Sequence, residues 1–124
     1  MKTQKVMFFT EKEQEFADLL INVGISRNTA NVLVFLANAP AATSRDIERG
    51  TDLRQPEVSL AMRFLSQKDW ITMSDQKKGN RSGRPNKVYK LRIPIKKIMD
   101  SIEKEKKEET RKKLERVAKL KSFI

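Results

Sequence analysis

The stretch Gln76–Arg92, QKKGNRSGRPNKVYKLR, contains seven lysines and arginines and no acidic residue. Glycine and proline lie at its centre, in Gly83–Pro85, and apolar and charged residues alternate from Val88 to Leu91. Alternation with a period of two is typical of a strand, and glycine and proline are typical of a turn. The sequence therefore predicts a β-hairpin with a strongly basic tip, whose other strand is Trp70–Ser74.

Capping residues and apolar spacing predict four helices before this hairpin. Thr10 and Glu13 have the spacing of a capping box, which starts the first helix, and Gly24 ends it. The helices are expected over residues 11–22, from Ser26 to before Pro40, over 43–49 with Gly50 closing the helix, and over 56–68 with Pro56 first. The apolar stripe of the first helix is expected to comprise Phe16, Leu19, Leu20 and Val23.

A long last helix is predicted from Ile95 to about Ile124. Three pairs at i,i+4 spacing support it: Glu103/Lys107, Glu108/Lys112 and Glu109/Lys113. Its apolar residues form one stripe at each end: Ile95, Ile98, Met99 and Ile102, and then Leu114, Val117, Leu120 and Ile124. Nothing else in the chain is left to cover the second stripe, so we expect a homodimer held by this helix.

Composition restricts the possible functions. The chain has 124 residues, a formal net charge of +11 and a pI near 10.1, which favour a polyanionic partner, although a ribosomal or membrane-surface protein shares this balance. It has no cysteine and no histidine, so disulfides and the usual zinc, iron and copper sites are excluded, and no cofactor is expected. No catalytic constellation can be assembled, so the chain is not expected to be an enzyme. Without a signal peptide or an apolar run of about 20 residues, we expect a cytoplasmic, nucleoid-associated protein with no membrane contact.

Four segments follow the order of a winged helix-turn-helix. They are Ala41–Ile47, Leu53–Ser59, Leu65–Ile71 and Gly83–Leu91. Over about residues 24–91 the chain resembles archaeal and bacterial winged-helix transcription regulators of the MarR and TrmB-like kinds. It differs at Asp69, where many relatives have glycine, and it lacks the sugar-binding domain of the larger TrmB-like proteins, so no effector is named.

The resemblance implies a mainly α fold with a small β-hairpin (α+β). Residues 1–93 would form a winged helix-turn-helix DNA-binding domain with an N-terminal helical extension, and residues 94–124 a C-terminal dimerisation helix. The partner would be double-stranded DNA, with the recognition helix, about 56–68, in a major groove. The basic wing, about 75–87, would lie on the backbone or in a minor groove.

Candidate DNA-binding residues begin around the recognition helix. Gln55, Glu57 and Ser59 lie where side chains reach base edges, although Gln55 and Glu57 equally suit local capping and the helix dipole. Arg54 and Arg63 suit phosphates, and Arg63 also guanine, or both are ordinary solvated arginines. Leu60 either contacts a thymine methyl group or packs against the second helix.

Further candidates lie at the third helix and in the wing. Thr43 and Ser44 either bind one phosphate at the helix N-terminus or only cap the helix. Gly83–Pro85 resembles the core of AT-hook peptides, which places Arg84 in a minor groove or on a phosphate. Electrostatic positioning is expected from Lys77, Lys78, Arg81 and Lys87. Trp70 and Tyr89 are read as structural residues.

These features favour a homodimeric, sequence-specific, double-stranded DNA-binding transcription regulator. One alternative is a chromatin-like or basal-transcription protein that binds DNA without sequence preference. Another is a winged-helix protein-interaction module, against which the acid-free basic wing argues. An RNA-binding role also fits the charge.

Overall fold

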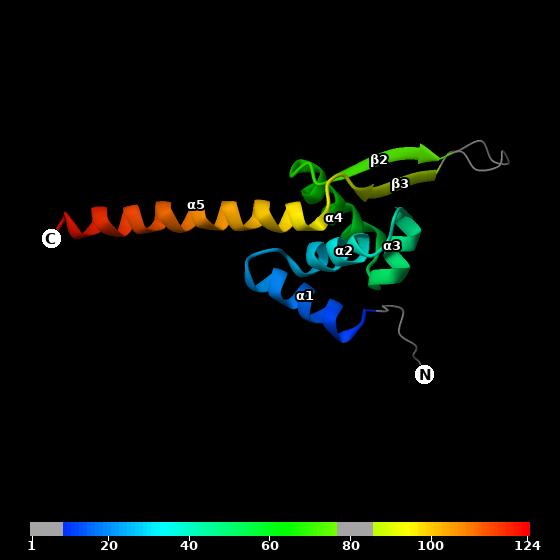
Figure 1. The fold of residues 1–124 in the computed structure, drawn as a ribbon, viewed down its shortest axis with the longest axis horizontal. Helices are drawn as coiled ribbons and strands as arrows, with labels where there is room; N and C mark the ends of the chain where they lie inside the picture. Colours follow the sequence, from blue (N-terminus) through cyan, green and yellow to red (C-terminus); the bar gives the residue numbers. More distant parts are fainter. Residues whose placement is uncertain (1–8, 77–85) are drawn as a thin grey trace. The chain divides into compact units, whose positions relative to one another are not determined.

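The computed structural model describes residues 9–76 and 86–124. Its chain divides into two compact units, Met1–Ile93 and Pro94–Ile124. The first unit contains helices α1 (Glu11–Asn22), α2 (Arg27–Ala37), α3 (Ser44–Thr51) and α4 (Gln55–Gln67), and strands β1 (Ala42–Thr43), β2 (Ile71–Gln76) and β3 (Asn86–Leu91) (Figure 1). The second unit is helix α5 (Ile95–Lys121). The mainly α fold with a small β-hairpin is thus confirmed.

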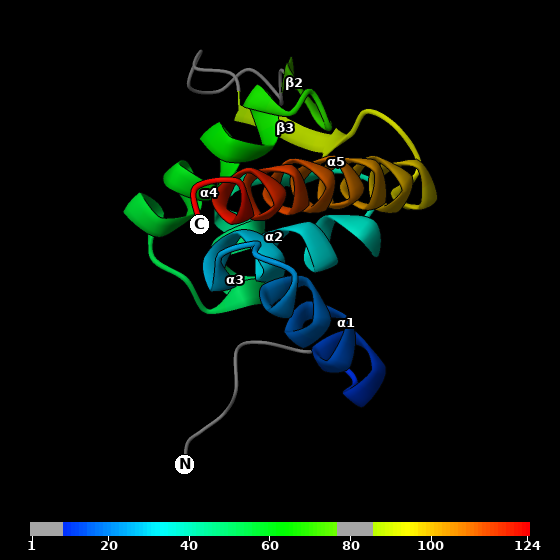
Figure 2. The same ribbon diagram turned by 90° about the vertical axis from the view of Figure 1, so that its left-hand side faces the viewer.

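Helix α2 forms the centre of the first unit. Buried residues occupy most of its length: Thr29, Ala30, Asn31, Val32, Leu33, Val34 and Leu36. Helices α1, α3 and α4 all pack against it, and Figure 2 shows α1 alongside it. A helix that is apolar on almost all sides is stable only in a protein interior. The wide distribution of apolar residues around α2 therefore explains its central position.

Helix α1 begins and ends where the sequence predicts. The Thr10 hydroxyl accepts from the Glu13 amide at 3.1 Å, and the Glu13 carboxylate accepts from the Thr10 amide at 2.8 Å. Its predicted apolar stripe is partly wrong, because Ala17 and Leu20 are buried while Leu19 is 56% exposed and Val23 42% exposed. The buried face is shifted toward the small Ala17, which allows close approach to α2.

Helix α3 continues past the glycine that was predicted to end it. Gly50 lies inside the helix, which runs to Thr51 and is followed by the cap residue Asp52, whose backbone is left-handed with φ of 60°. Gly50 is needed for another reason: a Cβ atom there would lie 2.1 Å from Cε1 of Phe35 on α2. Its missing side chain lets α3 and α2 pack closely.

Helix α4 starts one residue earlier than predicted, at Gln55, so Pro56 is its second residue. Its buried residues are the four predicted ones: Val58, Ala61, Met62 and Leu65. The chain leaves the helix through Asp69, whose φ is 65°, and the buried Trp70 precedes strand β2, which starts at Ile71, one residue later than predicted. The ring of Trp70 packs edge-on against Phe64, with centroids 6.2 Å apart, so the structural reading of Trp70 is confirmed.

The sheet has three antiparallel strands in the order β1-β3-β2. The predicted hairpin pairs Ile71 with Leu91 and Asp75 with Lys87. Strand β1 is an addition that the sequence did not predict, and it pairs Thr43 with Val88. At the base of the hairpin, Arg92 donates from its amide to the Trp70 carbonyl at 2.8 Å.

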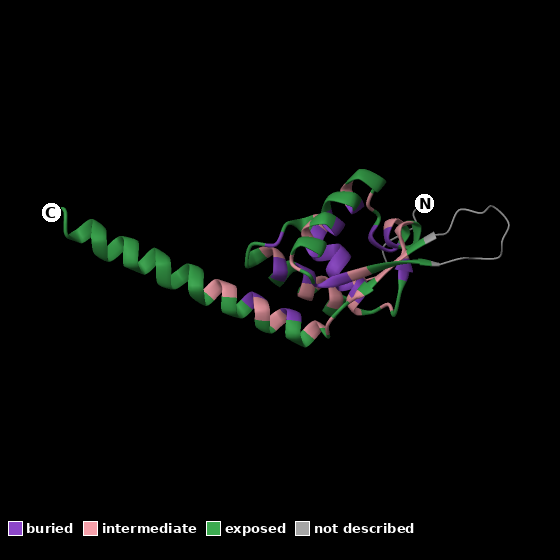
Figure 3. Ribbon diagram, turned by 90° about the horizontal axis from the view of Figure 1, so that it is seen from above, coloured by how far each residue is buried: buried purple, intermediate pink, exposed green. Residues whose placement is uncertain are grey.

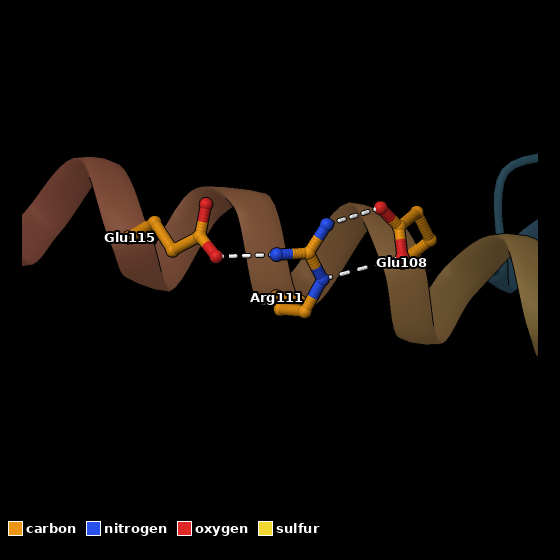
Figure 4. A network of polar contacts seen from close by, with 3 residues as sticks. All are labelled: Glu108, Arg111 and Glu115. Carbon is orange, nitrogen blue, oxygen red and sulfur yellow. Dashed lines mark hydrogen bonds and ion pairs between the residues drawn. The ribbon is translucent and has the colours of Figure 1, made fainter.

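Helix α5 is 27 residues long and carries networks of surface charges. Glu103 and Lys107 form the predicted pair at 3.3 Å. The other two predicted pairs differ: Glu108 pairs with Arg111 instead of Lys112, and Glu109 pairs with Lys106, at 3.2 Å, instead of Lys113. Arg111 also pairs with Glu115 (Figure 4). The hydrogen bond from Arg111 lowers the pKa of the Glu108 carboxyl, and the Glu108 carboxylate raises the pKa of Arg111. Among the described residues, no helix is long and apolar enough to cross a membrane.

Candidate nucleic-acid interface

The start of α3 is fixed by a second capping box. The Thr43 hydroxyl accepts from the Asp46 amide at 3.1 Å, and the Asp46 carboxylate accepts from the Thr43 amide at 3.0 Å. The predicted capping role of Thr43 is therefore confirmed. Its hydroxyl hydrogen stays available for donation, and the amides of the first turn, those of Ser44 and Arg45, have no intrahelical acceptor. Such a helix terminus favours anions.

The outward side of α4 carries the predicted recognition residues. Gln55, Ser59, Leu60 and Arg63 are all exposed, opposite the four buried residues of the helix. Leu60 is 65% exposed, which excludes the prediction that it completes the packing against α2. Gln55 lies near Ser59, with Nε2 3.5 Å from Oγ, at the upper limit for a hydrogen bond.

Glu57 has a local role in the structure. Its Oε1 atom accepts from the Arg54 amide at 2.8 Å, which satisfies an amide at the N-terminus of α4. This bond holds one carboxylate oxygen at the helix start, so the local interpretation of Glu57 is the one that the geometry supports. Arg54 itself is exposed.

The starts of α3 and α4 and the strand β3 surround one polar hollow of about 660 Å³. Its lining residues are Thr43, Ser44, Arg45, Glu48, Gln55, Lys87 and Tyr89. The pairing of β1 with β3 brings them together, because it places Thr43 opposite Val88 and thus beside Lys87 and Tyr89. The hollow therefore combines a helix N-terminus, a lysine and the first residue of α4.

Three residues of this hollow were not among the predicted site residues: Arg45, Glu48 and Tyr89. Lys87 and Tyr89 are two residues apart on one strand, so strand alternation alone could have assigned Tyr89 to the face of Lys87. Arg45 is exposed in the first turn of α3, next to the predicted Ser44. The predicted wing residues Lys77, Lys78, Arg81 and Arg84 lie outside the described residues.

Within the part of the chain that the structure describes, no cluster of three or more acidic side chains is placed to hold a metal ion. The polar groups of the hollow are instead hydroxyls, amides and cations, with Glu48 as the acidic member. Donors of this kind suit hydrogen bonding to phosphate oxygens and to base edges.

The comparisons with known proteins concern the fold. No protein-family model matches the sequence, and no curated protein matches it. A possible transcriptional regulator from Methanosarcina mazei Go1 superposes with a TM-score of 0.58 at 18% identity, over 87% of this chain and 88% of that one. MepR, a transcription regulator of the Staphylococcus aureus multidrug efflux pump MepA, gives a TM-score of 0.51 at 18% identity, over 86% of this chain and 76% of that one.

A further transcriptional regulator of known structure gives a TM-score of 0.54 at 14% identity. The match covers 65% of this chain and about half of the length of that protein, 53%. The chain has the winged helix-turn-helix fold that these transcription regulators share.

Proposed function

We propose that this chain is a sequence-specific, double-stranded DNA-binding regulator of transcription that acts as a homodimer and has no catalytic role. One observation carries the proposal: the polar hollow joins the starts of α3 and α4 to strand β3 in a chain of net charge +11. These are the elements that a winged helix uses to straddle a groove and its flanking phosphates.

Each part of the interface receives a role. Helix α4 enters a major groove, with Gln55, Ser59 and Arg63 toward base edges. Thr43, Ser44 and Lys87 contact one stretch of phosphate backbone, and Arg54 a neighbouring phosphate. The wing residues Lys77, Lys78, Arg81 and Arg84 lie on the backbone or in a minor groove.

The homodimer would be held by the second half of α5. From Lys107 to Ile124 every residue is exposed, as Figure 3 shows, and this part includes a set of large apolar side chains: Leu114, Val117, Leu120, Phe123 and Ile124. Leu120 is 64% exposed and Phe123 76% exposed. A homodimer would present two recognition helices to a two-fold symmetric site, whose half-sites lie about 34 Å apart in helix-turn-helix dimers.

The dimer can be tested by molecular mass in solution at micromolar concentration. The full chain is expected at twice the mass of one chain, and Val117→Glu is expected to produce monomers because it puts a charge into the stripe. Lys119→Glu, on the opposite side of the helix, is the matched control and should stay dimeric. A monomeric parent chain would remove the dimer from the proposal.

DNA binding can be tested with genomic fragments at physiological salt and excess competitor. We expect strong retention of a few fragments, and weaker retention by Arg63→Ala. Lys12→Ala on α1 removes the same charge from an exposed residue that lies neither on α4 nor in the hollow, and it should bind like the parent. Uniform weak binding would favour an architectural protein, and no binding would favour a protein-interaction module.

A further inference from the structure

One apolar side chain on α4 lies uncovered on the face that carries the recognition residues. Leu60 is 65% exposed. Of the other apolar residues of α4, four are buried and Pro56 lies in the first turn, where proline is favoured. Phe64 packs edge-on against Trp70, with the Lys68 ammonium 5.6 Å from its ring centroid. Leu60 therefore contributes nothing to the packing of its own domain that would explain a leucine there.

The surroundings of Leu60 do not form an apolar docking patch. Elsewhere among the described residues, the large exposed apolar side chains lie on α1, β2, α5 and the residues that follow α5, and none lies on α3 or on the rest of α4. Beside Leu60 the helix presents the exposed Ser59 and Arg63, and one turn away on either side lie Pro56 and Phe64, of which Phe64 is half-buried against Trp70. A protein partner would need a contiguous apolar area of several hundred Å², which a single leucine does not provide.

An exposed leucine flanked by a serine and an arginine matches the major groove. Its edges present hydrogen-bond donors and acceptors, and the C5-methyl group of thymine is the apolar feature among them. Ser59 can bond to either kind of group, and Arg63 can donate to guanine. The face of α4 thus has one position suited to a methyl group.

We infer that Leu60 is a specificity residue that contacts a thymine methyl group in each half-site. The inference rests on the proposed function and adds to it the identity of one base. Leu60 distinguishes T·A from C·G at that position, because cytosine has a C5 hydrogen and an amino donor where thymine has the methyl group and an acceptor.

The test replaces thymine by uracil, which removes the methyl group and leaves base pairing intact. A fragment retained by the parent chain is prepared with dTTP or with dUTP, and both forms are titrated. Loss of one buried methyl contact should weaken binding roughly fourfold, or about fifteenfold for a dimer with two half-sites. Single thymine-to-uracil duplexes then locate the position.

Two variants separate the methyl contact from a general effect of uracil on DNA shape. Leu60→Ala should bind the thymine form more weakly than the parent does, and should bind both forms equally. Arg63→Ala should also bind weakly but keep the preference for thymine. Since Leu60 is exposed, its truncation leaves the fold intact, and circular dichroism checks this.

The outcomes are distinct. Equal binding of both forms by the parent chain, or an undiminished thymine preference in Leu60→Ala, would overturn the inference and leave the proposed function standing. Absence of any preferred fragment would overturn both.

Discussion

Replacing Gly50 by alanine tests how closely α3 and α2 pack. The added Cβ atom would lie 2.1 Å from Cε1, 2.5 Å from Cδ1 and 2.9 Å from Cζ of Phe35. Carbon atoms in contact prefer about 3.5–4.0 Å. Rotation of the Phe35 ring about χ2 can move Cδ1 and Cε1 but leaves Cζ, which lies on the rotation axis, at 2.9 Å, so the whole ring must move.

The magnitude follows from two opposing effects. Alanine in a helix interior stabilises by about 1 kcal/mol relative to glycine, because it restricts the unfolded chain. Overpacking a core costs about 1–3 kcal/mol. A hollow of about 150 Å³ next to the ring, lined in part by Phe9 and Ala39, gives it partial room, which keeps the cost within this range. We expect a net loss of up to about 2 kcal/mol, or up to roughly 15 °C in Tm for a domain of this size.

Thermal unfolding followed by circular dichroism, at one protein concentration, measures this loss. Phe35→Leu removes the ring edge, so in that background Gly50→Ala should cost less or become stabilising. A Gly50→Ala variant that melts at the same or a higher temperature than the parent would refute the reasoning. So would an equal cost in both backgrounds.

Three further predictions concern local features. Thr43→Val should lower the unfolding free energy by about 1 kcal/mol because it removes the acceptor for the Asp46 amide; an unchanged urea midpoint would contradict this. Asp69→Ala should lower the free energy of unfolding by about 1 kcal/mol, because alanine is strained in the left-handed backbone conformation of this position, and Asp69→Gly should lower it less. Equal losses for the two variants in denaturant unfolding would contradict this. The hydrogen bond from Arg111 lowers the pKa of Glu108 in the folded helix. The contribution of this bond to the stability of the helix is therefore present above the ordinary carboxyl pKa and is lost as pH falls through the lowered pKa. In an acid titration followed by circular dichroism, the parent should lose helix content in a pH range where Glu108→Gln does not. Coincident titration curves of the two proteins would contradict the pairing of Glu108 with Arg111.

Much of the fold could be predicted because the signals are local. The first capping box joins residues three apart, so Thr10 with Glu13 can be read directly from the sequence. Thr43 was likewise predicted as a cap, without the reciprocal bond to Asp46 that completes a second box. The buried stripe of α4 could also be predicted, because its four residues follow the helical spacing. Asp69 is a related case: many relatives have glycine there, and the positive φ of 65° gives the physical reason.

The features that were missed depend on contacts between distant residues. Gly50 has the form of a helix stop, and only the position of the Phe35 ring explains why it lies within a helix. Strand β1 has two residues, too few for a periodic pattern, and it exists through its pairing with β3. The pairing of β1 with β3 also forms the hollow. The sequence therefore predicted Thr43, Gln55 and Lys87 as separate site residues, but it did not predict that they line one hollow together with Tyr89.

The ratio of affinities for a retained fragment and for competitor DNA of equal length tests the central claim most directly. It should be measured at physiological salt with the full chain. The account predicts a ratio of roughly a thousand or more, as expected for a site-specific regulator. A ratio near one would contradict it and identify the interface as one that reads only the phosphate backbone.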